Sequence, residues 1–149
     1  MVNSKRKGSQ FERDATKLLN AQIYGKWKRV PGSGALGAIL EEPTLQGDIT
    51  GKDIPGLPKG FLLDAKVGYG GAKQLTVQKE WLDKIRKEAE ATYSIPAVIC
   101  KFSGSREGAK VFVVMDLDAF AELVNRTSDV QEELNKTIWN TVGQKPENY

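Results

Sequence analysis

Residues 61–67, FLLDAKV, carry the clearest pattern of hydrophobic and polar positions in the chain. Successive side chains of a β-strand point to opposite faces, so a strand here has two chemically different faces. One face is apolar and carries Phe61, Leu63, Ala65 and Val67. The other face carries Asp64 and Lys66, which places a carboxylate and an amine together on a predominantly hydrophobic strand.

Apolar residues at three- and four-residue spacing predict helices over residues 9–21, 76–92 and 117–124. The first helix begins at Ser9-Gln10-Phe11-Glu12, which has the pattern of a capping box. The second helix has a sheet-facing stripe made of Gln78, Trp81, Leu82, Ile85 and Ala89. A last helix is expected at about 129–142, after a break at Thr127 and Ser128.

Short segments predict further strands at residues 27–30, which are basic, and at 48–50, 98–102 and 111–115. Residues 34–46 are predicted to form a long loop, and residues 1–8 a disordered basic tail. The resulting order of helices and strands predicts a single α/β domain over residues 1–149, with a mixed central sheet flanked by helices. Residues 127–149 would form a C-terminal helical extension of this domain.

Composition narrows the classes of protein and of chemistry. The 149 residues are 40% hydrophobic, which is enough for one core without disulfides. The chain has no apolar run of about 18 residues, no signal-peptide core and a single Cys100, so we expect a soluble protein of the cytoplasm, or of the host cytoplasm if it is viral. It has no histidine, which excludes histidine-dependent nucleases, the usual zinc sites and Ser-His-Asp triads. Catalysis would then use carboxylates, lysine, hydroxyls or a bound metal.

The net charge of +3 is unevenly distributed along the chain. The first thirty residues hold eight Lys or Arg and two acids, whereas the remaining 119 hold fourteen and seventeen. A basic N-terminal part predicts a surface that binds a polyanion such as DNA. Taken alone, the run Lys5-Arg6-Lys7 could also be a disordered tail that only aids solubility.

Asp48 lies sixteen residues before Asp64, at the end of the preceding predicted strand, so both carboxylates and Lys66 can converge. Mg²⁺ binds proteins through one or two carboxylates and keeps several waters, and the carbonyl oxygen of Ala65 is a candidate third ligand. Such a metal lowers the pKa of a bound water, and Lys66 can orient that water or neutralise charge that develops on a phosphate. Taken singly, Asp48 could be a turn residue and Lys66 an exposed strand residue.

The pattern Asp48…Asp64-Ala65-Lys66 resembles the PD-(D/E)XK nuclease superfamily, with Gly47 in place of the usual proline. Residues 8–13, GSQFER, and 29–33, RVPGS, are similar to segments of the archaeal-type Holliday junction resolvases, and the resemblance spans about residues 5–115. It implies a restriction-endonuclease-like core and a homodimer that cuts four-way DNA junctions by paired nicks, with Mg²⁺ as cofactor and Mn²⁺ as a substitute. Two features depart from that family: Asp64 stands where Glu is usual, and both residues 34–46 and the C-terminal tail are longer.

The resemblance also implies roles for single residues. Glu12 would complete the metal site formed by Asp48, Asp64 and Ala65, directly or through a water, and it could also be the capping partner of Ser9. Two further residues would act catalytically, with Ser33 near the scissile phosphate and Gln78 assisting Lys66, but each could equally be an ordinary turn or helix-start residue. The predicted contacts to the DNA backbone come from Lys5, Arg6, Lys7, Arg13, Lys28 and Arg29.

Two other functions remain open from the sequence. The chain could be another PD-(D/E)XK endonuclease, of restriction or repair type, that acts on duplex or flap DNA, although 149 residues leave little room for a separate recognition module. It could also be a non-catalytic DNA-binding relative, against which the intact set Glu12, Asp48, Asp64 and Lys66 argues. An RNA-binding module is disfavoured because the predicted strands lack an aromatic-rich face.

Overall fold

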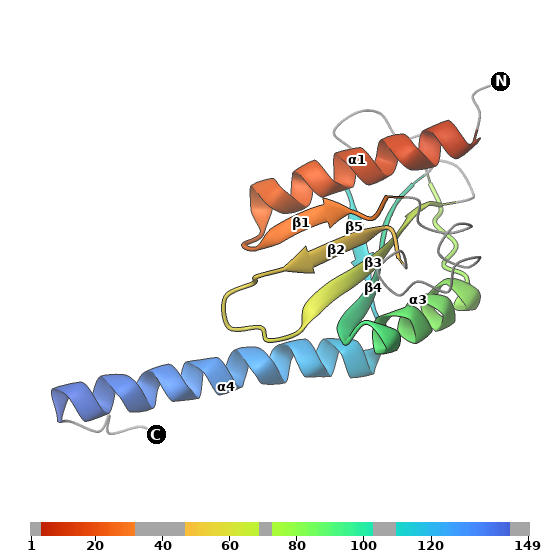
Figure 1. The fold of residues 1–149 in the computed structure, drawn as a ribbon. Coiled ribbons are helices and arrows are strands. Elements are labelled where there is room, and N and C mark those ends of the chain that lie inside the picture. The colour runs from red at the N-terminus through yellow and green to blue at the C-terminus, as the bar shows by residue number, and fades with distance from the viewer. Residues whose placement is uncertain (1–3, 32–46, 69–72, 103–109, 144–149) are drawn as a thin grey trace.

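The computed structural model of the chain describes residues 4–31, 47–68, 73–102 and 110–143. These residues form helices on both faces of one five-stranded sheet (Figure 1). The elements in chain order are α1 (Ser4–Gln22), β1 (Lys26–Arg29), β2 (Ile49–Lys52), β3 (Gly60–Val67), α3 (Lys79–Ala91), β4 (Ser94–Lys101), β5 (Phe112–Val114) and α4 (Leu117–Val142). The predicted mixed sheet flanked by helices is confirmed.

The strands lie in the sheet in their chain order, from β1 to β5. Only β3 and β4 are parallel, and α3 provides the crossover that a parallel pair requires. The other neighbouring pairs are antiparallel. The central strand β3 is therefore held on both sides, which fixes the positions of Asp64 and Lys66.

Both faces of the sheet are covered, because alternate side chains of β3 and β4 enter two separate cores. The core under α1 contains Phe11, Ala15, Leu19, Trp27, Ile49, Leu63, Ala97 and Ile99. The core under α3 contains Leu62, Trp81, Ile85, Ala89, Val98 and Cys100. The predicted apolar face of residues 61–67 is confirmed as the α1 face, and Asp64 and Lys66 lie on the face that α3 covers.

Helix α1 begins at Ser4, five residues earlier than predicted. The prediction of a disordered tail through residue 8 is therefore wrong for residues 4–8, because Lys and Arg are good helix formers and extend the helix. Ser9 lies inside the helix and cannot cap it. Its hydroxyl oxygen instead accepts hydrogen bonds from Arg13 and Arg29, both at 3.2 Å.

The two predicted C-terminal helices are one continuous helix, α4, so the predicted break at Thr127 and Ser128 is wrong. The hydroxyls of these two residues donate to the carbonyl oxygens of Leu123 (2.9 Å) and Val124 (3.0 Å), one turn earlier. Bonds of this kind let Ser and Thr remain inside a helix. The helix ends at Gly143, whose φ of 71° is the left-handed conformation common at helix ends.

Strand β4 begins at Ser94, four residues before the predicted start, because β3 pairs with it along its whole length. Pro96 is tolerated since β5 pairs only with residues 98–100 on the other side. The predicted loop over residues 34–46 lies outside the described residues. Among the described helices, none combines the length and apolar character needed to cross a membrane.

Candidate active site

Asp48 and Asp64 occupy facing positions at the end of the β2–β3 pairing. Ile49 pairs with Leu63, so the next positions outward are Asp48 and Asp64. The backbone of Asp48 is fixed on both sides, since its N–H donates to the Leu63 carbonyl oxygen (2.9 Å) and its own carbonyl oxygen accepts from Val30 (2.8 Å). Residues placed directly opposite on antiparallel strands have side chains close enough to interact.

The carboxylate of Asp48 lies along the edge of β3. Its Oδ2 accepts a hydrogen bond of 2.8 Å from the backbone N–H of Ala65. If β2 continued further, one of its backbone carbonyl oxygens would accept this bond instead. The carboxylate therefore satisfies a donor that the end of β2 leaves unpaired, and it is held next to Asp64.

Asp64 is buried, with 4% of its surface exposed, and its Oδ2 makes no hydrogen bond within the described part of the chain. The Nζ atom of Lys66 lies 3.3 Å from this oxygen, an ion pair without hydrogen-bond geometry. Burial first, and then the hydrogen bond and negative charge of Asp48, raise the pKa of Asp64 to about 7, against the opposing effect of Lys66. A buried carboxylate with an unbonded oxygen is costly unless a cation neutralises it.

Lys66 is held between the carboxylates and α3. Its Nζ lies 5.8 Å from the centre of the Trp81 ring, a cation–π distance, and about a third of its side chain is exposed. The amine is thus directed to the carboxylate pair by the aromatic ring while it keeps access to solvent.

Asp48 and Asp64 fit a divalent cation on two grounds. The buried Oδ2 of Asp64 accepts no hydrogen bond from the described residues although Lys66 lies 3.3 Å away, and two adjacent carboxylates provide the hard oxygen ligands that Mg²⁺ prefers. Within the described residues, no cluster of three or more His, Cys, Asp or Glu side chains is placed to hold a metal. A site of two carboxylates completed by waters is therefore the arrangement that this part of the chain supports.

Glu12 is not brought to this pair. Its Oε2 accepts hydrogen bonds from Nε (3.2 Å) and Nη2 (2.8 Å) of Arg29. Arg29 lies two residues beyond Trp27 on β1, and hence on the α1 face of the sheet, whereas Asp64 and Lys66 lie on the α3 face. The role of Glu12 as a metal ligand stays a prediction.

Helix α3 contributes a contact to this site that the sequence did not reveal. Glu88 Oε2 accepts a hydrogen bond of 2.9 Å from the backbone N–H of Gly47, the residue before Asp48. Gly47 has a φ of 70°, and a Cβ there would lie 2.5 Å from the Leu62 side chain, so only glycine fits. Glu88 therefore fixes the turn that presents Asp48. The sequence offered one indication of this contact, since Lys84 and Glu88 lie beside the predicted sheet-facing stripe of the helix. In the structure these two side chains form an ion pair of 3.6 Å.

The other predicted site residues are distributed as follows. Gln78 precedes α3 as its N-cap residue, with an exposed side chain, so its predicted place on the buried stripe is wrong because the helix begins only at Lys79. Ser33 and the side chain of Lys5 lie outside the described residues. The remaining basic residues are partly or fully exposed: Arg6, Lys7, Arg13, Lys28 and Arg29.

Lys28 differs from Arg29 in the face that it occupies. Lys28 pairs with Thr50, which pairs with Leu62, so these three positions share the α3 face with Asp64. Helix α3 packs on β3 and β4, and in Figure 1 β1 and β2 extend beyond it. Lys28 is thus exposed on the same side of the sheet as the carboxylate pair.

Comparisons with known proteins bear on this site. No curated protein matches the chain. Among solved structures, the chain is similar to Hjc, a Holliday junction resolvase of Archaeoglobus fulgidus, with 16% identity and a TM-score of 0.45 over 77% of this chain and 88% of that one. The model of the family described as "Phage putative PDDEXK endonuclease" matches residues 3–145. Because this match covers nearly the whole sequence, the chain belongs to that family of PD-(D/E)XK endonucleases.

Proposed function

We propose that this endonuclease is Mg²⁺-dependent and selective for four-way DNA junctions, which it resolves as a homodimer by paired nicks. The observation that carries the metal dependence is the buried Asp64, whose unbonded Oδ2 lies beside Asp48 and 3.3 Å from Lys66. Cation binding would offset the free-energy cost of burying the Asp64 carboxylate next to the half-buried carboxylate of Asp48.

The chemical roles follow from the positions of these side chains. Asp48 and Asp64 would hold the metal, with the Ala65 carbonyl as a further candidate ligand. Glu12 would have to leave its ion pair with Arg29 to contribute. When bound, the metal would supply charge for the phosphate and lower the pKa of a water. The Lys66 ammonium, 3.3 Å from Asp64, can donate to a water or to a phosphate oxygen at the same place. Glu88 holds the backbone at Gly47 and thereby the direction of Asp48.

Support for a junction substrate comes from the sequence motifs at residues 8–13 and 29–33, and from the placement of charge. Arg6, Lys7 and Arg13 are exposed on α1, and Lys28 is exposed on the side of the carboxylates. Such residues bind phosphates and carry little base recognition, as a structure-selective enzyme requires. A homodimer suits this substrate, because two symmetric active sites can cut two strands of a two-fold junction.

The test is cleavage of an immobile four-way junction with Mg²⁺ or Mn²⁺, beside duplex, flap and single-stranded DNA of matched sequence. We expect symmetric paired nicks on the junction, loss of cleavage with a chelator, and loss of cleavage with retained binding in Asp64→Asn. Equal cutting of duplex or flap DNA would assign the chain to the restriction or repair type instead. Binding without cleavage under every metal would identify a non-catalytic relative.

A further inference from the structure

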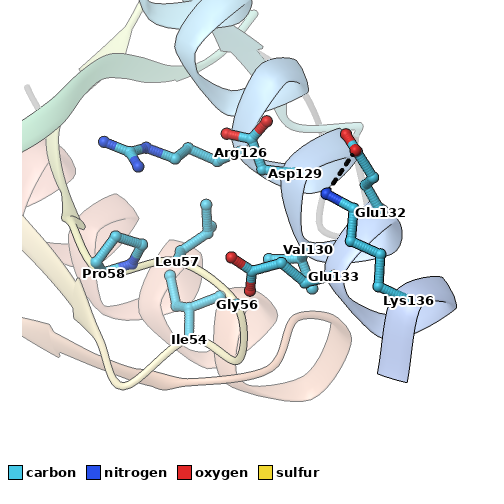
Figure 2. Close-up of a pocket in the computed structure, with 10 residues that line it drawn as sticks. All are labelled: Ile54, Gly56, Leu57, Pro58, Arg126, Asp129, Val130, Glu132, Glu133 and Lys136. Atoms are coloured by element: carbon cyan, nitrogen blue, oxygen red, sulfur yellow. Dashed lines mark ion pairs between the residues drawn. The ribbon is translucent and has the colours of Figure 1, made fainter. Parts of the chain in front are cut away.

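Most charged residues of helix α4 lie along the side that borders its own domain, although they keep contact with solvent, and the opposite side is uncharged and exposed. A pocket of about 650 Å³ separates α4 from the β2–β3 connection, and Figure 2 shows Ile54, Leu57 and Pro58 of that connection opposite the helix. The helix contributes five charged residues to the lining of this pocket: Arg126, Asp129, Glu132, Glu133 and Lys136. An ordinary surface helix buries its large apolar residues, whereas α4 leaves several of them exposed on the side away from the domain, although Ala119 is buried and Val130 lies against Gly56.

The outward face has the spacing of a helix-pairing seam. Assigning Leu117 to position a of a heptad gives positions a and d to Leu117, Phe120, Val124, Thr127, Gln131, Leu134, Ile138 and Thr141. We call these eight residues the α4 seam. Five of them are large hydrophobic residues that are 44% to 76% exposed.

Charge is absent from the positions that would touch a partner helix. The helix contains seven charged residues, and all of them lie at positions b, c and f: Asp118, Glu122, Arg126, Asp129, Glu132, Glu133 and Lys136. The flanking e and g positions hold only Ala, Ser, Asn, Val, Leu and Thr. Two copies could therefore meet along the seam without opposing like charges, although the helix as a whole carries three more acids than bases.

The exposed surface is long enough for a specific contact. With 26 residues, α4 is about 39 Å long, and Figure 1 shows it running beneath the β2–β3 connection and continuing beyond it. At a helix width of about 10 Å, the seam covers on the order of 400 Å² in projection on each copy. Two such faces amount to about 800 Å² in total, less than the roughly 1,200 Å² of a stable interface, so we expect the dimer to be weak and reversible.

We propose that the α4 seam pairs with the seam of a second copy of this chain, with the two helices antiparallel. In that arrangement Gln131 faces Thr127 of the second copy, and Val124 faces Leu134, so polar and apolar layers match except at the ends, where Leu117 faces Thr141. The bulky Phe120 then faces Ile138 rather than another Phe120, and the opposed helix dipoles attract. This assignment names the contact surface of the proposed homodimer, and its bearing on cleavage rests on the proposed function.

The first test is sedimentation velocity of the full chain across a wide concentration range. We expect a reversible monomer–dimer equilibrium in the wild type, and a monomer in the double variant Leu134→Glu and Ile138→Glu. The matched control is Asn125→Glu and Asn140→Glu, which adds the same charge to the same helix at exposed b and c positions and should dimerise normally. Circular dichroism confirms that each variant is folded. A wild type that stays monomeric, or a seam variant that still dimerises, would overturn the proposal.

Cysteine cross-linking tests the orientation, because Cys100 is buried and gives little background. A mixture of Val124→Cys and Leu134→Cys should form a disulfide-linked heterodimer under mild oxidation. Efficient linkage of Leu134→Cys to itself would instead indicate parallel helices and would overturn the antiparallel arrangement. These readouts do not use DNA, so a failure of the proposed nuclease function would leave them unaffected.

Discussion

Asp64 shows how the site differs from the rest of the interior. Among the described residues, Asp64 is the one charged or polar residue whose surface is buried. This burial opposes ionisation of its carboxyl group. Aspartate has one methylene less than the glutamate usual at this position in resembling resolvases, so its carboxylate stays close to β3. The short side chain is consistent with the burial of its Oδ2 and with the position of Lys66 only 3.3 Å away.

The first prediction concerns Asp64→Asn in the metal-free protein. The folded-state pKa of Asp64, about 7, lies above its ordinary value of 3.8, so ionisation destabilises the fold as pH rises from about 4 to 7 and the cost is complete above 7. The variant should therefore raise the melting temperature with a chelator at pH 8 by several degrees, corresponding to at most about 4 kcal/mol, and should have little effect near pH 4. Added Mg²⁺ should stabilise the wild type and not the variant.

Thermal melts at the two pH values, with and without Mg²⁺, measure this effect. Asp129→Asn is the control, because that aspartate is exposed on α4. Equal or lower stability of Asp64→Asn at pH 8 would contradict the cost assigned to the buried carboxylate.

The second prediction compares two lysines of β1. Lys28 is exposed on the side of the carboxylates and makes no ion pair with the described residues, whereas the Lys26 amine lies 3.1 Å from Asp53. Lys28→Ala should weaken junction binding and lower the slope of log K against log salt by about 0.9, the value for one lost phosphate contact. Lys26→Ala, whose charge is already balanced, should change both quantities less. Fluorescence anisotropy titrations at several salt concentrations would show equal slopes for both variants if Lys28 does not contact DNA.

At the scale of elements, helix α3 both covers the sheet and fixes the active site. Its buried residues Trp81, Ile85 and Ala89 pack on the sheet, and Glu88 on the same helix binds the Gly47 backbone. The geometry of the Asp48 carboxylate therefore depends on the docking of this helix as well as on its own strand.

The third prediction tests this link through Glu88. Glu88→Ala should reduce cleavage at least roughly tenfold and raise the Mg²⁺ concentration required for half-maximal activity, because small displacements of a reacting group are costly. Glu88→Gln keeps an oxygen that can accept from Gly47 and should retain most of the activity. Glu90→Ala changes an exposed residue of the same helix and serves as the control. Rescue by Gln would separate a positioning role from a direct role of the charge, in which Gln would fail as Ala does.

The elements also show what the sequence can and cannot predict. Strand β3 and its two faces were predictable because the two-residue period of Phe61, Leu63 and Ala65 is local. The convergence of Asp48 and Asp64 was predictable for the same reason, since consecutive strands commonly pair. The contact of Glu88 with Gly47 spans 41 residues and depends on how α3 docks, which no local pattern contains. The continuity of α4 was missed because Thr127 and Ser128 resemble a helix break unless their hydroxyls bond to the preceding turn.

At the scale of the whole molecule, a dimer through α4 would leave the active site of each copy complete. Asp48, Asp64, Lys66 and Glu88 all lie on β2, β3, α3 and the adjoining turn, whereas the seam lies on α4. Each site could then cut one strand independently, and the role of dimerisation would be to deliver two cuts in one binding event. Loss of the dimer should therefore convert paired nicks into single nicks without abolishing cleavage.

The last prediction follows from mixing subunits. Wild type and Asp64→Asn should exchange through a reversible dimer, so a wild-type fraction f gives active pairs in proportion to f² and dimers with one active site in proportion to 2f(1 − f). Paired cleavage of a junction in excess of protein should thus fall as the square of f, while single nicks from mixed dimers rise to a maximum when half of the protein is wild type and then fall. When the same mixture is made with subunits that also carry Leu134→Glu and Ile138→Glu, we expect only single nicks. Their rate should fall in direct proportion to f. A linear fall of paired cleavage by the wild type would mean that one subunit makes both cuts, because only independent subunits give a linear dependence.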